Sequence, residues 1–240
     1  MTAPLLAVTG LVKDYRGLRP LRIRELAVAE GDLVSITGLD EAAAEIFVSL
    51  VTGAGLPDEG AVALFGRPTA DIPDTTAWLQ TLERLGLVSA RAVLVEPFSA
   101  RQNIAMPYTL DVDPLDPAVA PRVDALASEV GLDPDIRDVP VGQASPDAVT
   151  RVRLARALAL DPALLLAEHP TAALDPAAAA AFGADLARIA AARRTAVVAL
   201  TADGAFAEAL GGRTLTLRPG TGELTSGGIF SRLARKIMSK

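Results

Sequence analysis

Two residues with side chains suited to metal binding or acid–base chemistry, Glu168 and His169, come directly after an apolar run at 163–167. Such a run is typical of a strand buried on both faces of a parallel sheet, and open α/β sheets bind ligands at the carboxyl ends of these strands. Glu168 could bind a metal ion, and His169, the only histidine, could act as a general base. Because a base needs a bound substrate to act on, we favour a structural, hydrogen-bonded histidine at the strand end.

A second group of chemically interesting positions follows 33–37, which we expect to be a buried strand ending at Gly38. A strand, a glycine and a helix in this order form the setting of a phosphate-binding loop, G-x-x-x-x-G-K-[ST]. Counted from Gly38, three positions of that motif hold other residues: Ala43 for the second glycine, Ala44 for the lysine and Glu45 for the hydroxyl. The motif itself is therefore absent.

Acidic residues stand instead at the start of the expected helix, about 41–51. The first N–H groups of a helix are unpaired, and in phosphate-binding proteins the phosphate satisfies them. We hypothesise that a carboxylate of Asp40 or Glu41 caps this helix and stands in for the phosphate. Glu45 lies a turn further in, and we expect it to point to solvent.

Alternating strands and helices surround these residues. We expect strands at 5–12, 21–29, 33–37, 61–65, 86–90, 163–167, 195–201 and 214–218. We expect helices at 41–51, 74–85, 122–130, 176–193 and 205–210, and another that begins with Ser145 as its N-cap and ends before Pro162. This alternation indicates an α/β protein with a mostly parallel sheet.

The spacing around 144–175 resembles the ATPase subunit of ABC transporters. That family has a signature segment LSGGQ, then QR…ARAL, a Walker B strand ending in DEP, and SALD. This chain aligns with that pattern without a gap at Ser145, Arg151, Ala155-Arg156-Ala157-Leu158, Pro162, Pro170-Thr171 and Leu174-Asp175. The resemblance covers about 5–224. It implies a P-loop NTPase fold of the ABC-ATPase type: a mostly parallel sheet flanked by helices, a small antiparallel β subdomain and an inserted helical subdomain.

The resemblance also implies domain bounds and site positions. The ABC-like domain is expected at 1–228, with the helical subdomain at about 86–160. Positions that match the family's nucleotide site are Tyr15, Gly38, Asp40, Glu41, Ala43, Ala44, Glu45, Ile46, Ala90, Ser145 and Asp175. Positions that match its catalytic residues are Glu168, His169 and Ala202. Ala90 replaces the Q-loop glutamine and Ala202 the histidine that senses the γ-phosphate.

These replacements affect binding as well as catalysis. Loss of the lysine and of one glycine-dependent backbone contact removes roughly 3–6 kcal/mol of charge-assisted hydrogen bonding. That loss corresponds to a weakening on the order of 10²–10⁴ in affinity. We therefore expect no ATP or Mg²⁺ as cofactor, no resident metal, and a catalytically degenerate ABC subunit with a structural or regulatory role. A working ATPase with an atypical site or in a heterodimer, and a soluble scaffold unrelated to transport, are the alternatives.

The composition and the remaining segments limit the kinds of partner that we expect. The net charge of −6 argues against nucleic-acid binding, and the absence of cysteine excludes disulfides and thiolate metal sites. No secretory signal is visible, so we expect a cytoplasmic protein, and the resemblance implies a peripheral position at the inner face of the cell membrane. The resemblance implies a transmembrane permease partner, docked near 97–108, and a homodimer or a heterodimer with another ABC ATPase subunit. The basic, amphipathic tail at 229–240 could touch a membrane surface or a partner.

Overall fold

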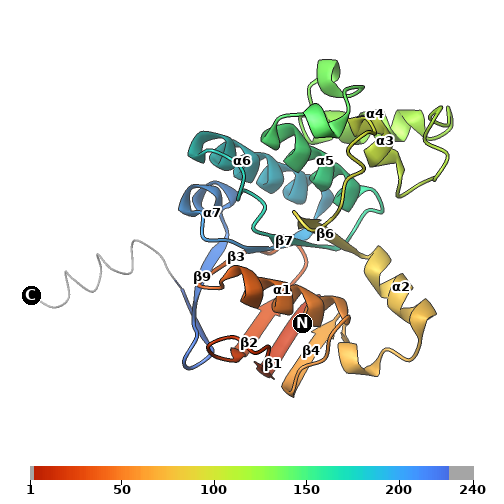
Figure 1. Ribbon diagram of the computed structural model, residues 1–240. Helices are drawn as coiled ribbons and strands as arrows, with labels where there is room; N and C mark the ends of the chain where they lie inside the picture. Colours follow the sequence, from red (N-terminus) through yellow and green to blue (C-terminus); the bar gives the residue numbers. More distant parts are fainter. Residues whose placement is uncertain (1–2, 227–240) are drawn as a thin grey trace, which may run out of the picture.

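A six-stranded sheet forms the centre of the protein in a computed structural model, which describes residues 3–226 (Figure 1). Its strands are β3 (Leu33–Thr37), β6 (Leu85–Ser89), β7 (Leu164–Glu168), β8 (Ala196–Leu200), β9 (Arg213–Arg218) and β10 (Glu223–Ser226). The order across the sheet is β10-β9-β3-β8-β7-β6. All neighbours are parallel except β10, which runs antiparallel to β9. The carboxyl ends of β3, β6, β7 and β8 therefore meet at one edge.

A smaller antiparallel sheet lies beside it. Its strands are β1 (Leu6–Lys13), β2 (Leu21–Val28), β4 (Glu59–Leu64) and β5 (Arg67–Pro68), in the order β2-β1-β4-β5. In β2, Leu21, Ile23, Leu26 and Val28 are buried while Arg22, Arg24, Glu25 and Ala27 are exposed. This sheet therefore buries one face and leaves the other to solvent.

Helices cover both faces of the six-stranded sheet. They are α1 (Glu41–Thr52), α2 (Thr75–Glu83), α3 (Ala100–Ala105), α4 (Ala120–Glu129), α5 (Pro146–Leu158), α6 (Pro176–Arg193) and α7 (Gly204–Leu210). Short 3-10 turns lie at Thr69–Asp71, Pro134–Ile136 and Val141–Gln143. Figure 1 shows α1 on the same side as the antiparallel sheet and α5, α6 and α7 on the other side, with α3 and α4 beyond α5.

Two apolar cores follow from the pleat of the central strands. In β7, Leu165 and Ala167 pack in the core under α5, α6 and α7, while Leu164 and Leu166 pack in the core under α1. Because successive side chains of a strand alternate between faces, Glu168 points to the α1 side. This alternation sets which helix can meet the last residue of β7.

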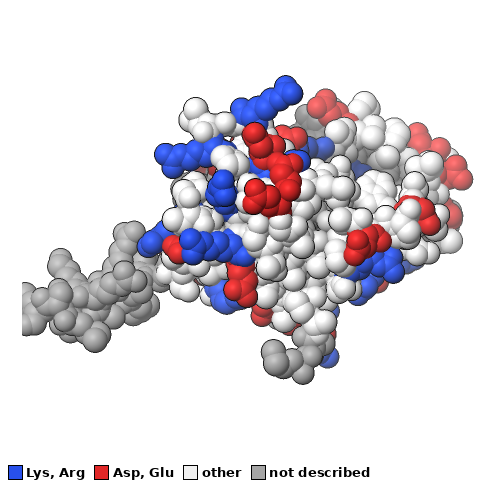
Figure 2. Space-filling view, turned by 90° about the horizontal axis from the view of Figure 1, so that it is seen from below, with Lys and Arg blue, Asp and Glu red and all other residues white. Residues whose placement is uncertain are grey.

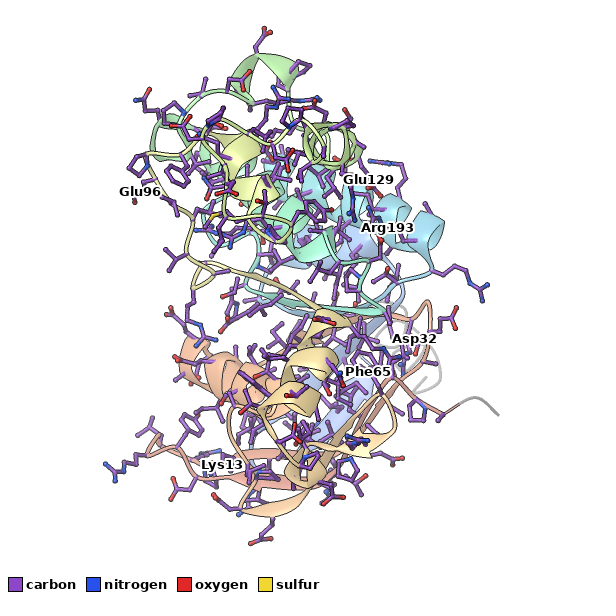
Figure 3. All side chains as sticks on the ribbon, turned by 90° about the vertical axis from the view of Figure 1, so that its right-hand side faces the viewer. Lys13, Asp32, Phe65, Glu96, Glu129 and Arg193 are labelled. Atoms are coloured by element: carbon purple, nitrogen blue, oxygen red, sulfur yellow. The ribbon has the colours of Figure 1, made fainter. Side chains whose placement is uncertain are left out.

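Ion pairs connect the outer helices to the rest. Figure 3 shows Glu129 of α4 beside Arg193 at the end of α6. Arg193 also pairs with Asp161, at 2.7 Å.

On the face shown in Figure 2, acidic and basic side chains are interspersed, as on an ordinary solvated surface. No helix among residues 3–226 is long and apolar enough to cross a membrane.

The expected elements form with small shifts at their ends. β3 and α6 have the expected bounds, and α5 begins after Ser145 as expected. The structure adds β5, β10 and α3, which were not expected. The bounds 86–160 for a helical subdomain stay a prediction; β6 belongs to the sheet, and α3, α4 and α5 follow it in the chain. The tail at 229–240 lies outside the described residues.

Candidate functional site

The start of α1 forms one side of the candidate site. Gly38 has φ 88°, and a Cβ there would lie 2.8 Å from the backbone oxygen of Leu217, so only glycine fits without strain. The next turn is capped by Asp40, whose carboxylate accepts a hydrogen bond of 2.8 Å from the N–H of Ala43. The hypothesis of an acidic cap is confirmed for Asp40. Glu41 is exposed at the first helical position.

The two alanines of the altered motif belong to the core. Ala43 and Ala44 are 7% and 0% exposed, in the same apolar cluster as Phe47. Ala44 has no charged side chain that could bind a phosphate, its N–H already donates to the oxygen of Asp40 at 2.9 Å, and it is packed in the core. Ile46, two residues later, is half-buried against this core. The side chains of this part of α1 therefore contribute packing and no charged or polar group for a ligand.

The end of β7 forms the other side of the site. Glu168 is 5% exposed, although it is a carboxylate at the end of a buried strand. Its Oε2 accepts a hydrogen bond of 2.6 Å from the hydroxyl of Ser89, the residue opposite it in β6. Arg91 donates to both carboxylate oxygens, with Nη2 2.8 Å from each and Nε 3.2 Å from Oε2. The buried carboxylate is thus fully paired.

Arg91 also reaches the helix α1. Its Nη1 lies 2.5 Å from Oε1 of Glu45, whose side chain is 56% exposed. Glu45 is exposed to solvent, as expected, but it is also ion-paired, because the guanidinium extends from the segment after β6 and bridges Glu45 and Glu168. Arg91 was not among the expected site residues, although its position directly after Ala90, beyond a strand end, was an available signal.

His169 is held by its backbone. Its φ is 41°, in the left-handed region, and its N–H donates to the oxygen of Leu200 at 2.8 Å. The ring atom Nε2 is buried and has no hydrogen-bond partner among the described residues, 3–226. The expectation of a hydrogen-bonded His169 is therefore correct for the main chain and wrong for Nε2. His169 contacts no other predicted catalytic side chain through a hydrogen bond in that part of the chain.

A cavity of about 390 Å³ opens beside the start of α1. It is lined by Tyr15, Arg19, Arg22, Gly38, Asp40, Ala43 and Leu217, among others. Partial burial, and then the nearby carboxylate of Asp40, raise the pKa of Tyr15. The fold therefore brings Tyr15 together with three of the predicted nucleotide-site residues. A cavity of this size with an aromatic wall is suited to a small ligand.

The remaining predicted positions lie apart from this cavity. Ala90 and Ala202 are exposed and offer no polar side chain. Ser145 caps α5 by accepting from the N–H of Ala148, and Asp175 caps α6 by accepting from two N–H groups. Both are exposed, and the cap accounts for each of them. None of these four residues lines the 390 Å³ cavity.

Comparisons with known proteins give relatives over most of the chain. No protein-family model matches. The lipoprotein-releasing system ATP-binding protein LolD 2 of Caulobacter vibrioides is 36% identical over 184 residues, 74% of this chain and 78% of that protein. The corresponding LolD of Alcanivorax borkumensis is 31% identical over 210 residues, 86% of this chain and 91% of that protein.

Solved structures show the same fold. The cbiO1 protein from Clostridium perfringens, described as part of the ABC transporter complex cbiONQ, has a TM-score of 0.79 at 19% identity and covers 99% of this chain and 93% of its own. The ATP-binding cassette MJ0796, described as a dimer bound to ADP and Pi, has a TM-score of 0.73 at 23% identity and covers 91% of this chain and 96% of its own. The parallel sheet, the antiparallel sheet and the flanking helices are thus common to all three structures.

Proposed function

The chain belongs to the ATP-binding cassette family of ABC transporters, and we propose that it is a nucleotide-binding subunit of that type with a degenerate phosphate site. In this role it contributes structure or regulation to a membrane transport complex and hydrolyses ATP very weakly or not at all. Membership of the family supports the type of subunit. The residues of this chain at the phosphate site support the loss of catalysis.

One observation carries the second part: Arg91 bridges Glu45 and Glu168. Phosphoryl transfer from ATP needs a lysine or equivalent cation on the phosphates, a hydroxyl and carboxylates on Mg²⁺, and an oriented water. Here Ala44 offers no charge, and the carboxylates of Glu45 and Glu168 are both paired with Arg91 of the same protein. Two negative side chains beside one guanidinium also leave an excess of negative charge, which disfavours a triphosphate.

A working ATP-binding subunit is the second candidate, and the names of the relatives favour it. Two relatives that match most of this chain are called ATP-binding proteins. The cavity beside Tyr15 supports nucleotide binding as well, because an aromatic ring and two arginines line it. In this version the base and sugar bind at Tyr15 while the phosphates are held in an unusual way or by a partner subunit.

We further propose a dimer and a membrane-spanning partner at the cytoplasmic face. The cbiO1 protein is part of a transporter complex, and MJ0796 forms a dimer, which supports both ideas by analogy. A groove of about 220 Å³ on this chain supports the second. It is lined by Leu87, Leu94, Pro107 and Leu160 together with Arg153 and Arg156. Burial lowers the pKa of both arginines, and they donate only to backbone oxygens within residues 3–226.

The test is ATP binding and hydrolysis by the purified protein. We expect calorimetry with Mg-ATP to show no micromolar binding, and turnover to be indistinguishable among the wild type, Glu168→Gln and His169→Ala. A contaminating ATPase would be common to all three preparations and would decline on further purification. Steady turnover that survives purification, and that Glu168→Gln or His169→Ala removes, would establish the working-ATPase candidate instead.

A further inference from the structure

Segment 90–95, which follows β6, is held by arginine side chains on two sides. Arg91 reaches from it to Glu168 at the end of β7 and to Glu45 on α1. From the opposite side, Arg156 of α5 donates to the backbone oxygen of Val93 at 2.7 Å, and Arg153 lies 3.5 Å from that of Ala90. This segment is also the connection from the central sheet to α3. Its position therefore affects how α3 and the helices that follow it sit against the sheet.

The side-chain oxygens around the guanidinium are of the kind that hard divalent cations bind. Glu45 and Glu168 supply carboxylate oxygens, and Ser89 supplies a hydroxyl that lies 2.6 Å from Glu168. Hard divalent cations bind oxygen ligands of these kinds, commonly one or two carboxylates. In this chain the oxygens of Glu168 are already used by the guanidinium fork and by Ser89. A metal ion and Arg91 could not use them at the same time.

Burial explains why a cation is required. Glu168 is 5% exposed, and an unpaired carboxylate in such a place is costly. Arg91 is suited to this task because its planar guanidinium donates two parallel hydrogen bonds to one carboxylate and keeps a third nitrogen for another. Its own backbone N–H donates to the hydroxyl of Ser89 at 3.0 Å, which places the side chain at the strand end.

We propose that Arg91 is a built-in cation that occupies the place of a divalent metal ion between Glu45 and Glu168 and fastens segment 90–95 to the carboxyl edge of the sheet without any ligand. The arrangement excludes divalent metal from these carboxylates as long as Arg91 is present. It goes beyond the proposed function, because the ion pairs are formed by this chain alone and do not depend on whether ATP binds in the cavity beside Tyr15.

Two substitutions separate the charge of Arg91 from its geometry. Arg91→Ala removes the cation and frees both carboxylates, so Mn²⁺ titrated in the absence of nucleotide should bind about tenfold or more tightly than to the wild type. Adding Glu168→Gln to this variant should remove the gain. Arg91→Lys keeps a point charge without the fork, so it should still exclude Mn²⁺ but release the segment.

Hydrogen exchange provides the second readout. Amides of 90–95 should exchange about tenfold faster in Arg91→Ala and Arg91→Lys than in the wild type. Arg213→Ala is the control, because Arg213 pairs with Asp32 at the opposite end of β3. Equal Mn²⁺ affinity in the wild type and Arg91→Ala would overturn the exclusion. Unchanged exchange at 90–95 in either Arg91 variant would overturn the fastening, and Arg91→Lys tests it even if Arg91→Ala does not fold.

Discussion

Arg91 and Glu168 face each other at the carboxyl edge of the central sheet, with Nη2 of Arg91 2.8 Å from both oxygens of Glu168. The pair is asymmetric, since the Glu168 side chain is 6% exposed while that of Arg91 is 45% exposed. The buried carboxylate of Glu168 therefore needs the ion pair to offset its loss of hydration, whereas the guanidinium of Arg91 remains partly hydrated. A charged residue can end a buried strand here because its partner arrives from the neighbouring strand's loop.

This asymmetry gives different costs for the two glutamates. Glu168→Gln should lower the free energy of unfolding by about 1–3 kcal/mol, because it weakens buried, charge-assisted hydrogen bonds. Glu45→Gln should cost less than about 1 kcal/mol, because the Glu45 side chain is more than half exposed. Urea unfolding of both variants measures the difference. Equal losses would show that Glu168 is not the buried anchor described here.

Docking of a membrane subunit can be tested with matched surface leucines. Leu160 lines the groove that we propose as the docking surface, Leu56 lines a separate pocket, and both are 49% exposed. Leu160→Glu should abolish co-purification of a membrane subunit in mild detergent, whereas Leu56→Glu should not. Phe98 and Met106 also belong to the region expected to dock, but they pack against the core, so charged replacements there would test folding.

Retention of the membrane subunit by Leu160→Glu would remove this groove as the docking surface. Loss of the subunit in Leu56→Glu as well would indicate a general folding defect. Circular dichroism of both variants distinguishes that defect from a local one.

Much of the fold was predictable because the buried strands are short, mostly apolar stretches bounded by turn residues. The run at 163–167 forms β7 almost unchanged, and 33–37 forms β3 with the expected bounds. The short helix α3 was missed because six residues carry too little periodicity to be recognised. β10 was missed because its four residues, ELTS, are mostly polar and gain their order by pairing with β9.

The candidate site was only partly predictable. Caps are local, so Asp40 at the start of α1 could be anticipated from the residues next to it. The contact of Arg91 with Glu45 and Glu168 joins residues 46 and 77 positions apart in the chain, and only the parallel sheet brings them together. Alternation along β7 does place Glu168 on the α1 side, but nothing in the sequence shows how far the Arg91 side chain reaches.

The cap of α1 can be tested by a neighbouring pair of acids. Asp40→Ala removes the acceptor for the N–H of Ala43 and should lower the free energy of unfolding by about 1 kcal/mol. Glu41→Ala changes an exposed residue in the same turn and should stay within about 0.5 kcal/mol of the wild type. Thermal or urea unfolding measures both. A larger loss of unfolding free energy for Glu41→Ala than for Asp40→Ala would show that Asp40 is not the residue that caps α1.

The glycine before α1 can be tested in the same way. Gly31 and Gly38 both have positive φ, but only Gly38 has a backbone oxygen 2.8 Å from where a Cβ would lie. Gly31→Ala should cost roughly 1 kcal/mol for the backbone conformation alone. Gly38→Ala should cost roughly 1–3 kcal/mol more, because Leu217 must move. Urea unfolding that gave the two variants the same stability would show that β9 yields easily at this point.

The ionisation of Tyr15 reports on the cavity itself. The chain has two tyrosines, and Tyr108→Phe leaves Tyr15 as the only phenol that titrates. Partial burial and then the charge of Asp40 raise the pKa of Tyr15 above its ordinary value of 10.0. Absorbance at alkaline pH should therefore give a midpoint above 10.0 in Tyr108→Phe, and adding Asp40→Asn should lower it while keeping a side chain able to cap α1.

The raised pKa of Tyr15 makes the folded protein less stable at alkaline pH. Because the folded protein favours the neutral phenol, the stabilisation from Tyr15 is complete below pH 10.0 and is lost as the pH rises through the raised pKa. Unfolding of Tyr108→Phe in urea should show this decline, and it should be smaller after Asp40→Asn. A Tyr15 midpoint at 10.0 that Asp40→Asn leaves unchanged would mean that the ring faces solvent, away from the start of α1, and that it does not form a wall of the cavity.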